Sequence, residues 1–190
     1  NGSDDVEAIN AVSGERCSPP PHNFTDRMYR PGDQAFFDVI QSYMGYRTCY
    51  YRTLNVGSYT PAQKEAYQKA REWIDNAIEL VKPGLTTDKI AEVWPRAEEF
   101  GFASEMEAFG LQFGHGLGLA LHERPIISRL VSFENPFELK EGMVFALETY
   151  CPAEDGNGAA RIEEEVVVTA DGCKIITLFP SKELFVANAY

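Results

Sequence analysis

Two of the three histidines and several carboxylates lie between Phe113 and Glu165, in segments that otherwise read as buried strands. His115 stands between two glycines, Glu148 follows the apolar run MVFAL, and Glu163 lies in the segment IEEEVVV. An ionised carboxylate in an apolar strand is costly unless a positive charge meets it. Imidazole and carboxylate oxygens are usual ligands of divalent metals, and one ion offsets several buried negative charges. A divalent ion is therefore the simplest partner for these residues, although their spacing alone does not bring them to one site.

Two further polar residues outside this stretch are candidates for the same chemistry. Asp38 lies between two apolar residues in FFDVIQ, so it is either a ligand or a residue on an exposed strand face. His22 follows three consecutive prolines, which forbid helix and favour an extended path, and it therefore belongs to a loop. A functional role and a plain surface position are both open for His22 on this evidence.

Composition predicts a single domain over residues 1–190 that acts on a small molecule or peptide. A chain of 190 residues with 44% hydrophobic content suffices for one core and is short for two. The net charge of -12 argues against nucleic acid or an anionic membrane as a partner. Four cysteines without a CxxC pair read as reduced thiols of a cytoplasmic protein, and no apolar run approaches the roughly 20 residues of a membrane span.

Residue patterns along the chain predict strands, then two helices, then strands. The apolar positions after Thr60-Pro61 step by three and four through residue 81, which predicts an amphipathic helix. A second helix is expected from Thr86 to about Phe100, bent at Pro95. Residues 1–12 read as the end of a helix or a ragged terminus, and residues 101–112 as a loop. Strands are expected within 34–57, 143–150, 161–169 and 173–179, the last after a turn at 171–172.

This order of elements predicts an α+β domain with helices packed on a largely antiparallel sheet. The glycines around His115 fit neither a Rossmann nor a P-loop spacing, so a phosphate cradle is not indicated. We expect Gly114 and Gly116 to let the backbone pass close to a bound ion or substrate.

Several spaced motifs, in the right order, resemble the pita-bread metalloenzyme family, which includes methionine aminopeptidase, Xaa-Pro aminopeptidase, prolidase and creatinase. The resemblance covers roughly residues 12 to 178 and implies the pita-bread fold. It also implies that the chain is the later part of the catalytic domain, without an N-terminal part. The matching motifs are FFDVIQ at 36–41, GYRTCYYRT at 45–53, GHGLG at 114–118, FALETY at 145–150 and RIEEEVVVT at 161–169.

The resemblance implies a ligand set for one or two divalent ions, which could be Mn, Co, Fe or Zn. The ligands implied are Asp38, His115, Glu148 and Glu163. The family's second aspartate, eleven positions after the first, is Cys49 here. A thiolate ligates zinc or iron but bridges hard ions less readily than a carboxylate, so the resemblance leaves Cys49 a doubtful ligand.

Three further residues receive roles from the resemblance. His22 and His122 would face the substrate and stabilise its developing negative charge. Glu148 or Glu163 would also move a proton to the leaving amine. Arg161 would bind substrate or orient Glu163, although a plain surface ion pair is equally compatible with the sequence.

The function implied is a metal-dependent hydrolase like the Xaa-Pro peptidases, which cleaves an amide bond with activated water and forms a homodimer. One alternative is a creatinase-like enzyme that acts on a small metabolite without a metal, which Cys49 favours. A second alternative is a catalytically silent pita-bread domain that binds a partner.

Overall fold

The computed structural model describes residues 2–18, 25–108 and 113–189 and shows an α+β fold with two sheets. All neighbouring strands are antiparallel except β3 and β9, which confirms the predicted sheet type. The first sheet has the order β1 (Asp5–Ser13), β2 (Gln34–Tyr43), β3 (Tyr46–Val56) and β9 (Phe185–Ala187). The second has the order β5 (Glu123–Ile127), β4 (Gly114–Gly116), β6 (Val144–Pro152), β7 (Ala159–Val168) and β8 (Cys173–Ile175).

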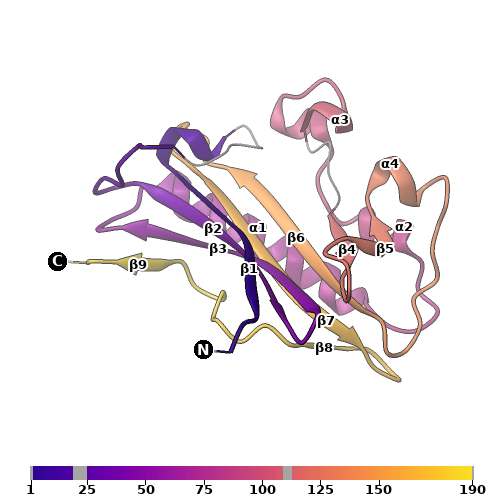
Figure 1. The fold of residues 1–190 in the computed structure, drawn as a ribbon. Coiled ribbons are helices and arrows are strands. Elements are labelled where there is room, and N and C mark those ends of the chain that lie inside the picture. The colour runs from indigo at the N-terminus through magenta and orange to yellow at the C-terminus, as the bar shows by residue number, and fades with distance from the viewer. Residues whose placement is uncertain (1, 19–24, 109–112, 190) are drawn as a thin grey trace.

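One long helix covers the second sheet, and the short helices α2 (Thr87–Ala91) and α4 (Arg129–Ser132) lie near β4 and β5 (Figure 1). The long helix α1 runs from Pro61 to Leu80 and packs against β6 and β7. None of the helices in the described ranges is long and apolar enough to cross a membrane. The short helices are η1 (Gly14–Cys17), α2 (Thr87–Ala91), η2 (Ala97–Phe100), α3 (Glu105–Ala108) and α4 (Arg129–Ser132).

Helix α1 begins where its sequence predicts. The Thr60 hydroxyl accepts a hydrogen bond from the Gln63 N–H, and the Gln63 side chain accepts one from the Thr60 N–H. This reciprocal capping box satisfies two backbone donors at the helix start, and Pro61 needs no partner there. Ala70 and Ile74 then bury one face of the helix against β6 and β7. This packing holds β6 and β7 of the second sheet in place.

Four sequence predictions about elements were wrong or incomplete. Residues 5–13 form strand β1 rather than the end of a helix, because pairing with β2 supplies their backbone partners. The second helix ends at Ala91, since Pro95 lacks an N–H and disfavours helical geometry at the residue before it. The loop predicted for 101–112 contains the short helix α3. The strand expected at 173–179 ends at Ile175, and it is not the last, because β9 follows it.

The two sheets meet along β3 and β7, and this junction sets the geometry of the site. Thr53 Oγ1 donates to the Arg161 carbonyl at 2.7 Å and accepts from the Arg161 N–H at 2.8 Å. A side chain therefore completes the backbone pairing where the two sheets separate. Residues from both sheets can reach each other across this line.

A cluster of charged residues stabilises the turn that precedes β2. The Arg27 guanidinium donates to both carboxylate oxygens of Asp33, at 2.6 and 3.1 Å, and Asp33 also accepts from the Arg30 N–H. Burial alone raises the pKa of Asp33, but the hydrogen bonds from Arg27 and Arg30 outweigh it, and the pKa lies below its usual value. The charged form of Asp33 thus stabilises the fold.

We expect Asp33→Asn to lower the free energy of unfolding by roughly 2 kcal/mol at pH 7, because it weakens several hydrogen bonds to a charged group. A folded-state pKa below the unfolded one gives stability that is complete above about pH 3.9 and is lost as the pH falls through the folded pKa. Urea unfolding from pH 7 to 3 should show the difference from wild type shrinking with acid. The exposed Asp26→Asn is the control, and a deficit that is constant with pH would contradict the assignment.

Candidate metal centre

Strands β4, β6 and β7 place His115, Glu148 and Glu163 on one face of the second sheet. Glu148 and Glu163 are directly opposite each other in the β6–β7 pair. His115 is opposite Ala146, which lies two residues before Glu148 and therefore shares its face. All three side chains are at most 9% exposed. The three residues that suggested a metal ion in the sequence therefore lie close together in the fold.

The first sheet brings Asp38 and Cys49 to the same place from the other side of the junction. In the β2–β3 pair Cys49 is opposite Ile40, two residues from Asp38, so both side chains lie on one face. The Cys49 thiol donates to Asp38 Oδ1 at 3.4 Å and lies 3.7 Å from Glu163 Oε2. Both residues are buried. Cys49 is thus the residue that connects the two sheets within the cluster.

His115 is held in a defined orientation. Its Nδ1 lies 3.1 Å from the Gly116 carbonyl, and because a carbonyl only accepts, Nδ1 carries the proton. Nε2 then faces Glu163 Oε1 at 3.6 Å. Orientation of one ring nitrogen by a backbone carbonyl is the usual arrangement of a metal-binding histidine.

The glycines beside His115 accommodate neighbouring protein backbone, and the expectation that they also let the chain pass close to an ion or substrate stays a prediction. A Cβ on Gly114 would lie 2.5 Å from the Ala146 carbonyl oxygen, and one on Gly116 would overlap the Arg124 carbonyl. Strand β4 pairs with β5 on one side and with β6 on the other. Only glycine fits at these two positions. The close packing of the backbone on both sides fixes the position of His115 in the sheet.

Glu148 forms an ion pair with Arg161 rather than pointing freely at the cluster. Arg161 Nη2 donates to Glu148 Oε2 at 2.6 Å, and the guanidinium lies 3.7 Å from the centre of the Tyr51 ring. Arg161 is only 7% exposed, so it is not part of a surface ion pair. Its carboxylate partner is Glu148, whereas the resemblance suggested Glu163. Arg161 therefore supplies the positive charge closest to the buried acids.

Of the two other histidines predicted for the site, His122 lies within the described residues and His22 does not. The His122 ring lies 4.3 Å from the His115 ring, centroid to centroid, and His122 is exposed. It therefore stands at the solvent side of the cluster. His22 lies outside the described residues, and its role stays a prediction.

The charges of the cluster shift the pKa values of its members. Burial alone would lower the pKa of His115, but the carboxylates of Glu163 and Glu148 raise it to about 9. Burial raises the pKa of Glu163 and of Glu148. Burial and the same carboxylates raise the pKa of the Cys49 thiol. For His122, burial and the neighbouring His115 lower the pKa. The cluster thus contains more buried acidic groups than basic ones, and such a site attracts cations.

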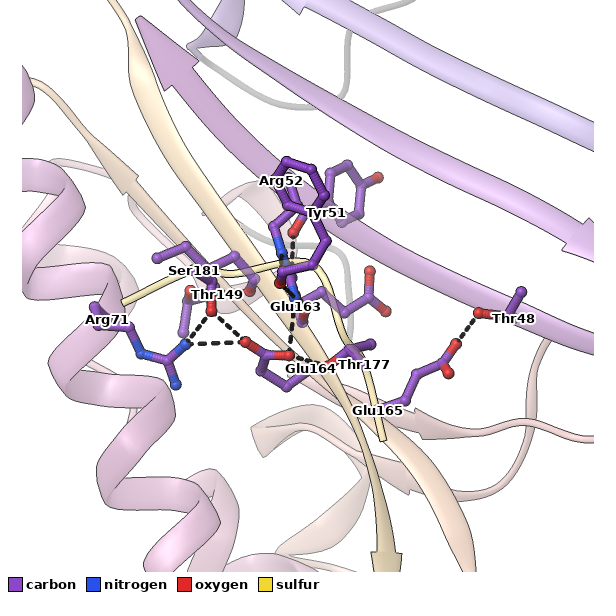
Figure 2. Close-up of polar contacts among 12 residues, drawn as sticks. Thr48, Tyr51, Arg52, Arg71, Thr149, Glu163, Glu164, Glu165, Thr177 and Ser181 are labelled. Atoms are coloured by element: carbon purple, nitrogen blue, oxygen red, sulfur yellow. Dashed lines mark hydrogen bonds and ion pairs between the residues drawn. The ribbon is translucent and has the colours of Figure 1, made fainter. Parts of the chain in front are cut away.

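Sequence reasoning missed two residues that support the cluster. Asn10 Nδ2 donates to Asp38 Oδ2 at 2.9 Å, but Asn10 belongs to β1, which was not predicted as a strand. Glu165 accepts from the Cys49 N–H at 2.7 Å and also from the Thr48 hydroxyl (Figure 2). The alternation of a strand already places Glu165 on the face of Glu163, so this second residue could have been found.

Glu164 points the other way and ties α1 and the C-terminal segment to β7 (Figure 2). It forms ion pairs with Arg52 at 3.0 Å and with Arg71 of α1 at 3.1 Å. Thr177 and Ser181 donate hydroxyl hydrogen bonds to the same carboxylate. Arg52 also donates to the Glu163 backbone carbonyl. The network therefore holds the backbone of β7 directly behind the cluster.

The donor set fits a divalent cation. Ligand atoms of Cys49, His115 and Glu163 all lie within 4.8 Å of one another. Glu163 Oε1 is buried and accepts no hydrogen bond from any residue in the described ranges. A buried carboxylate oxygen without a hydrogen-bond donor is costly, and a bound cation would offset that cost more fully than the His115 ring at 3.6 Å does. Sulfur, nitrogen and oxygen donors in one cluster are the ligands that transition metals take.

The folding pattern and the cluster together define a pita-bread domain with a candidate metal centre at its sheet junction. The model of metallopeptidase family M24 matches residues 2–170. The Xaa-Pro dipeptidase of Pyrococcus furiosus is 33% identical over 169 residues, which covers 87% of this chain and 46% of that protein. The chain belongs to metallopeptidase family M24.

Solved structures agree with this assignment of fold and family. The crystal structure of dipeptidase PepE from Mycobacterium ulcerans has a TM-score of 0.82 at 30% identity and covers 97% of this chain and 48% of that chain. The X-Pro aminopeptidase from Thermotoga maritima has a TM-score of 0.81 at 30% identity and covers 98% and 51%. This chain spans about half the length of the relatives it matches.

Proposed function

We propose that the protein is a metal-dependent peptidase of the Xaa-Pro type, and that residues 1–190 contribute its catalytic domain. The observation that carries this proposal is the meeting of Asp38, Cys49, His115, Glu148 and Glu163 at the junction of the two sheets. Several relatives are named as Xaa-Pro dipeptidases. A divalent ion held by these residues, Mn, Co, Fe or Zn, would act as a Lewis acid toward the amide carbonyl and lower the pKa of water.

The residues of the chain have separate parts in this proposal. His115 and Glu163 would hold the ion, with Asp38 and Glu148 beside them. Their pairing across strands fixes their positions before substrate arrives, which removes the need to reorganise them during the reaction. Burial raises the pKa of Glu148 although Arg161 pairs with its Oε2, so the other carboxylate oxygen would take up a proton and pass it to the leaving amine.

The two outer histidines are assigned to the substrate. His122 stands beside His115 on the solvent side of the cluster, and partial desolvation of its ring together with the His115 charge lowers its pKa. A neutral imidazole there can donate a hydrogen bond to the carbonyl oxygen as negative charge develops. We assign the same type of role to His22 on the family resemblance alone.

A creatinase-like reaction without a metal is the second candidate, and two observations favour it. Cys49 replaces a carboxylate of the family motif. Arg161 already neutralises Glu148 at 2.6 Å, so part of the buried acid has a cation from the protein itself. In that reaction the histidines alone would transfer protons. The two candidates differ in their need for added ions.

The test measures amide hydrolysis with chemically matched substrates. The metal-free protein is supplied in turn with Mn²⁺, Co²⁺ and Zn²⁺, and release of proline from an Xaa-Pro dipeptide is compared with release of alanine from the Xaa-Ala analogue. Hydrolysis that needs an ion and favours proline supports the proposal. Turnover of neither dipeptide in the presence of bound metal would contradict it and would point to the non-peptide substrate or the silent binding domain.

Three finer assignments also belong to the proposal. All four cysteines are free, which suits the reducing cytoplasm, and we place the protein there. Peptides or small molecules are its partners, in keeping with the net charge of -12. The homodimer that the resemblance implies stays a prediction.

A further inference from the structure

The thiol of Cys49 occupies the centre of the cluster rather than its edge. Its Sγ lies 3.4 Å from Asp38 Oδ1 and 3.7 Å from Glu163 Oε2. Cys49, His115 and Glu163 are 5%, 1% and 0% exposed. The Cys49 N–H donates to Glu165, and this bond fixes the backbone that carries the thiol. The sulfur is therefore positioned as precisely as the other donor atoms.

Three donor atoms of different chemistry face one another at this point. His115 Nδ1 donates to the Gly116 carbonyl, which leaves the Nε2 side of the ring toward Glu163. Glu163 Oε1 is buried and accepts no hydrogen bond within the described part of the chain. Cys49 Sγ completes the group. One sulfur, one imidazole nitrogen and one carboxylate oxygen form a donor set typical of zinc and cobalt sites.

The other two carboxylates have fewer free oxygens than a two-ion site requires. Asp38 Oδ2 accepts a hydrogen bond from Asn10, and Glu148 Oε2 accepts one from Arg161. Cys49 offers a single donor atom where an aspartate would offer two. The donors that remain suffice to surround one ion.

We infer that Cys49 Sγ, His115 Nε2 and Glu163 bind a single divalent ion, and that the thiolate makes the site select zinc or cobalt over manganese. The inference rests on the proposed function and specifies the ion that this site takes. On binding, the S–H bond of Cys49 breaks, a sulfur–metal bond forms, and the proton leaves for solvent. Soft sulfur donors favour zinc and cobalt, whereas manganese prefers oxygen.

The test uses Co²⁺ as a probe whose absorption reports the ligand directly. A thiolate bound to Co²⁺ gives a near-ultraviolet charge-transfer band, which oxygen and nitrogen ligands do not give. We expect the band in wild type and its loss in Cys49→Ser, together with at least a roughly 100-fold loss of Zn²⁺ affinity. Cys151→Ser is the matched control, because Cys151 is a buried free thiol outside the cluster, and it should keep the band.

A second variant measures the number of ions. By elemental analysis after dialysis, wild type should retain one equivalent of Zn²⁺ per chain. Cys49→Asp should bind a second equivalent and gain affinity for Mn²⁺, because it replaces one sulfur donor with two oxygens. Circular dichroism of both Cys49 variants checks that they are folded.

The outcomes separate this inference from the proposed function. Co²⁺ that binds and supports dipeptide hydrolysis without a charge-transfer band would overturn the thiolate ligand and leave the peptidase proposal standing. Two equivalents of metal in wild type would overturn the single-ion site in the same way. A band without hydrolysis would support the thiolate and contradict the peptidase. Failure to bind any divalent ion would overturn both.

Discussion

Replacing Glu163 by Gln is expected to lower the rate of dipeptide hydrolysis by roughly 10³-fold or more. A metal ion contributes several kcal/mol to stabilising the transition state, and each 1.36 kcal/mol corresponds to a factor of ten. Glu163 supplies the buried carboxylate oxygen without a hydrogen-bond donor, so binding of the proposed ion would depend on it most directly. Initial rates at saturating substrate, with bound metal measured in the same samples, check this result.

The same substitution should leave the metal-free protein at least as stable as wild type. Burial, together with the nearby carboxylates of Glu148 and Asp38, disfavours the charged form of Glu163 more than His115 favours it, so the pKa of Glu163 is raised and removing its charge should not weaken the metal-free fold. Loss of function with retained stability is the behaviour of a residue selected for binding rather than for folding. The exposed Glu98→Gln is the control and should change neither quantity. A Glu163→Gln variant that unfolds readily would contradict the role assigned here.

The adjacent Glu164 should show the opposite behaviour. We expect Glu164→Ala to lower the free energy of unfolding by about 3–5 kcal/mol, because it leaves Arg52 and Arg71 in a buried network without their shared carboxylate. The hydroxyls of Thr177 and Ser181 lose their acceptor as well. Urea unfolding followed by circular dichroism measures the loss.

Asp75→Ala provides the matched control for this network. Asp75 pairs with the same Arg71 at 2.6 Å, but its side chain is 56% exposed. An exposed partner contributes about 0–1 kcal/mol. Equal losses in Glu164→Ala and Asp75→Ala would mean that burial does not decide the strength of these pairs, contrary to the account. Of these two consecutive glutamates of β7, Glu163 is thus expected to serve metal binding and Glu164 to serve stability.

The parts of the fold that the sequence predicted correctly are those governed by local signals. Helix α1 has a capping box and a clear apolar period, and the strands around Glu148 and Glu163 contain the apolar runs VFAL and VVV. Strand β1 is acidic at its start and largely exposed, so its pairing depends on β2 rather than on its own pattern. Strand β9 pairs in parallel with a strand more than a hundred residues earlier, which no local pattern reveals.

The candidate site was predicted through residue types but not through its contacts. Buried carboxylates in apolar strands gave the members of the cluster, and the family resemblance joined them. The partner of Arg161 and the contact between Asn10 and Asp38 depend on register across sheets, which spacing along one chain does not encode. The bond from the Cys49 N–H to Glu165 likewise appears only in the folded chain.

The most direct test of the central claim is a titration of the metal-free protein with Co²⁺, in which bound metal and the initial rate of Xaa-Pro dipeptide hydrolysis are measured in the same samples. We predict that the rate rises in proportion to the bound ion and levels off when the site is filled. His115→Ala should show neither binding nor hydrolysis. Full hydrolysis before any ion is added, or a filled site without hydrolysis, would contradict a metal-dependent peptidase at the junction of the two sheets.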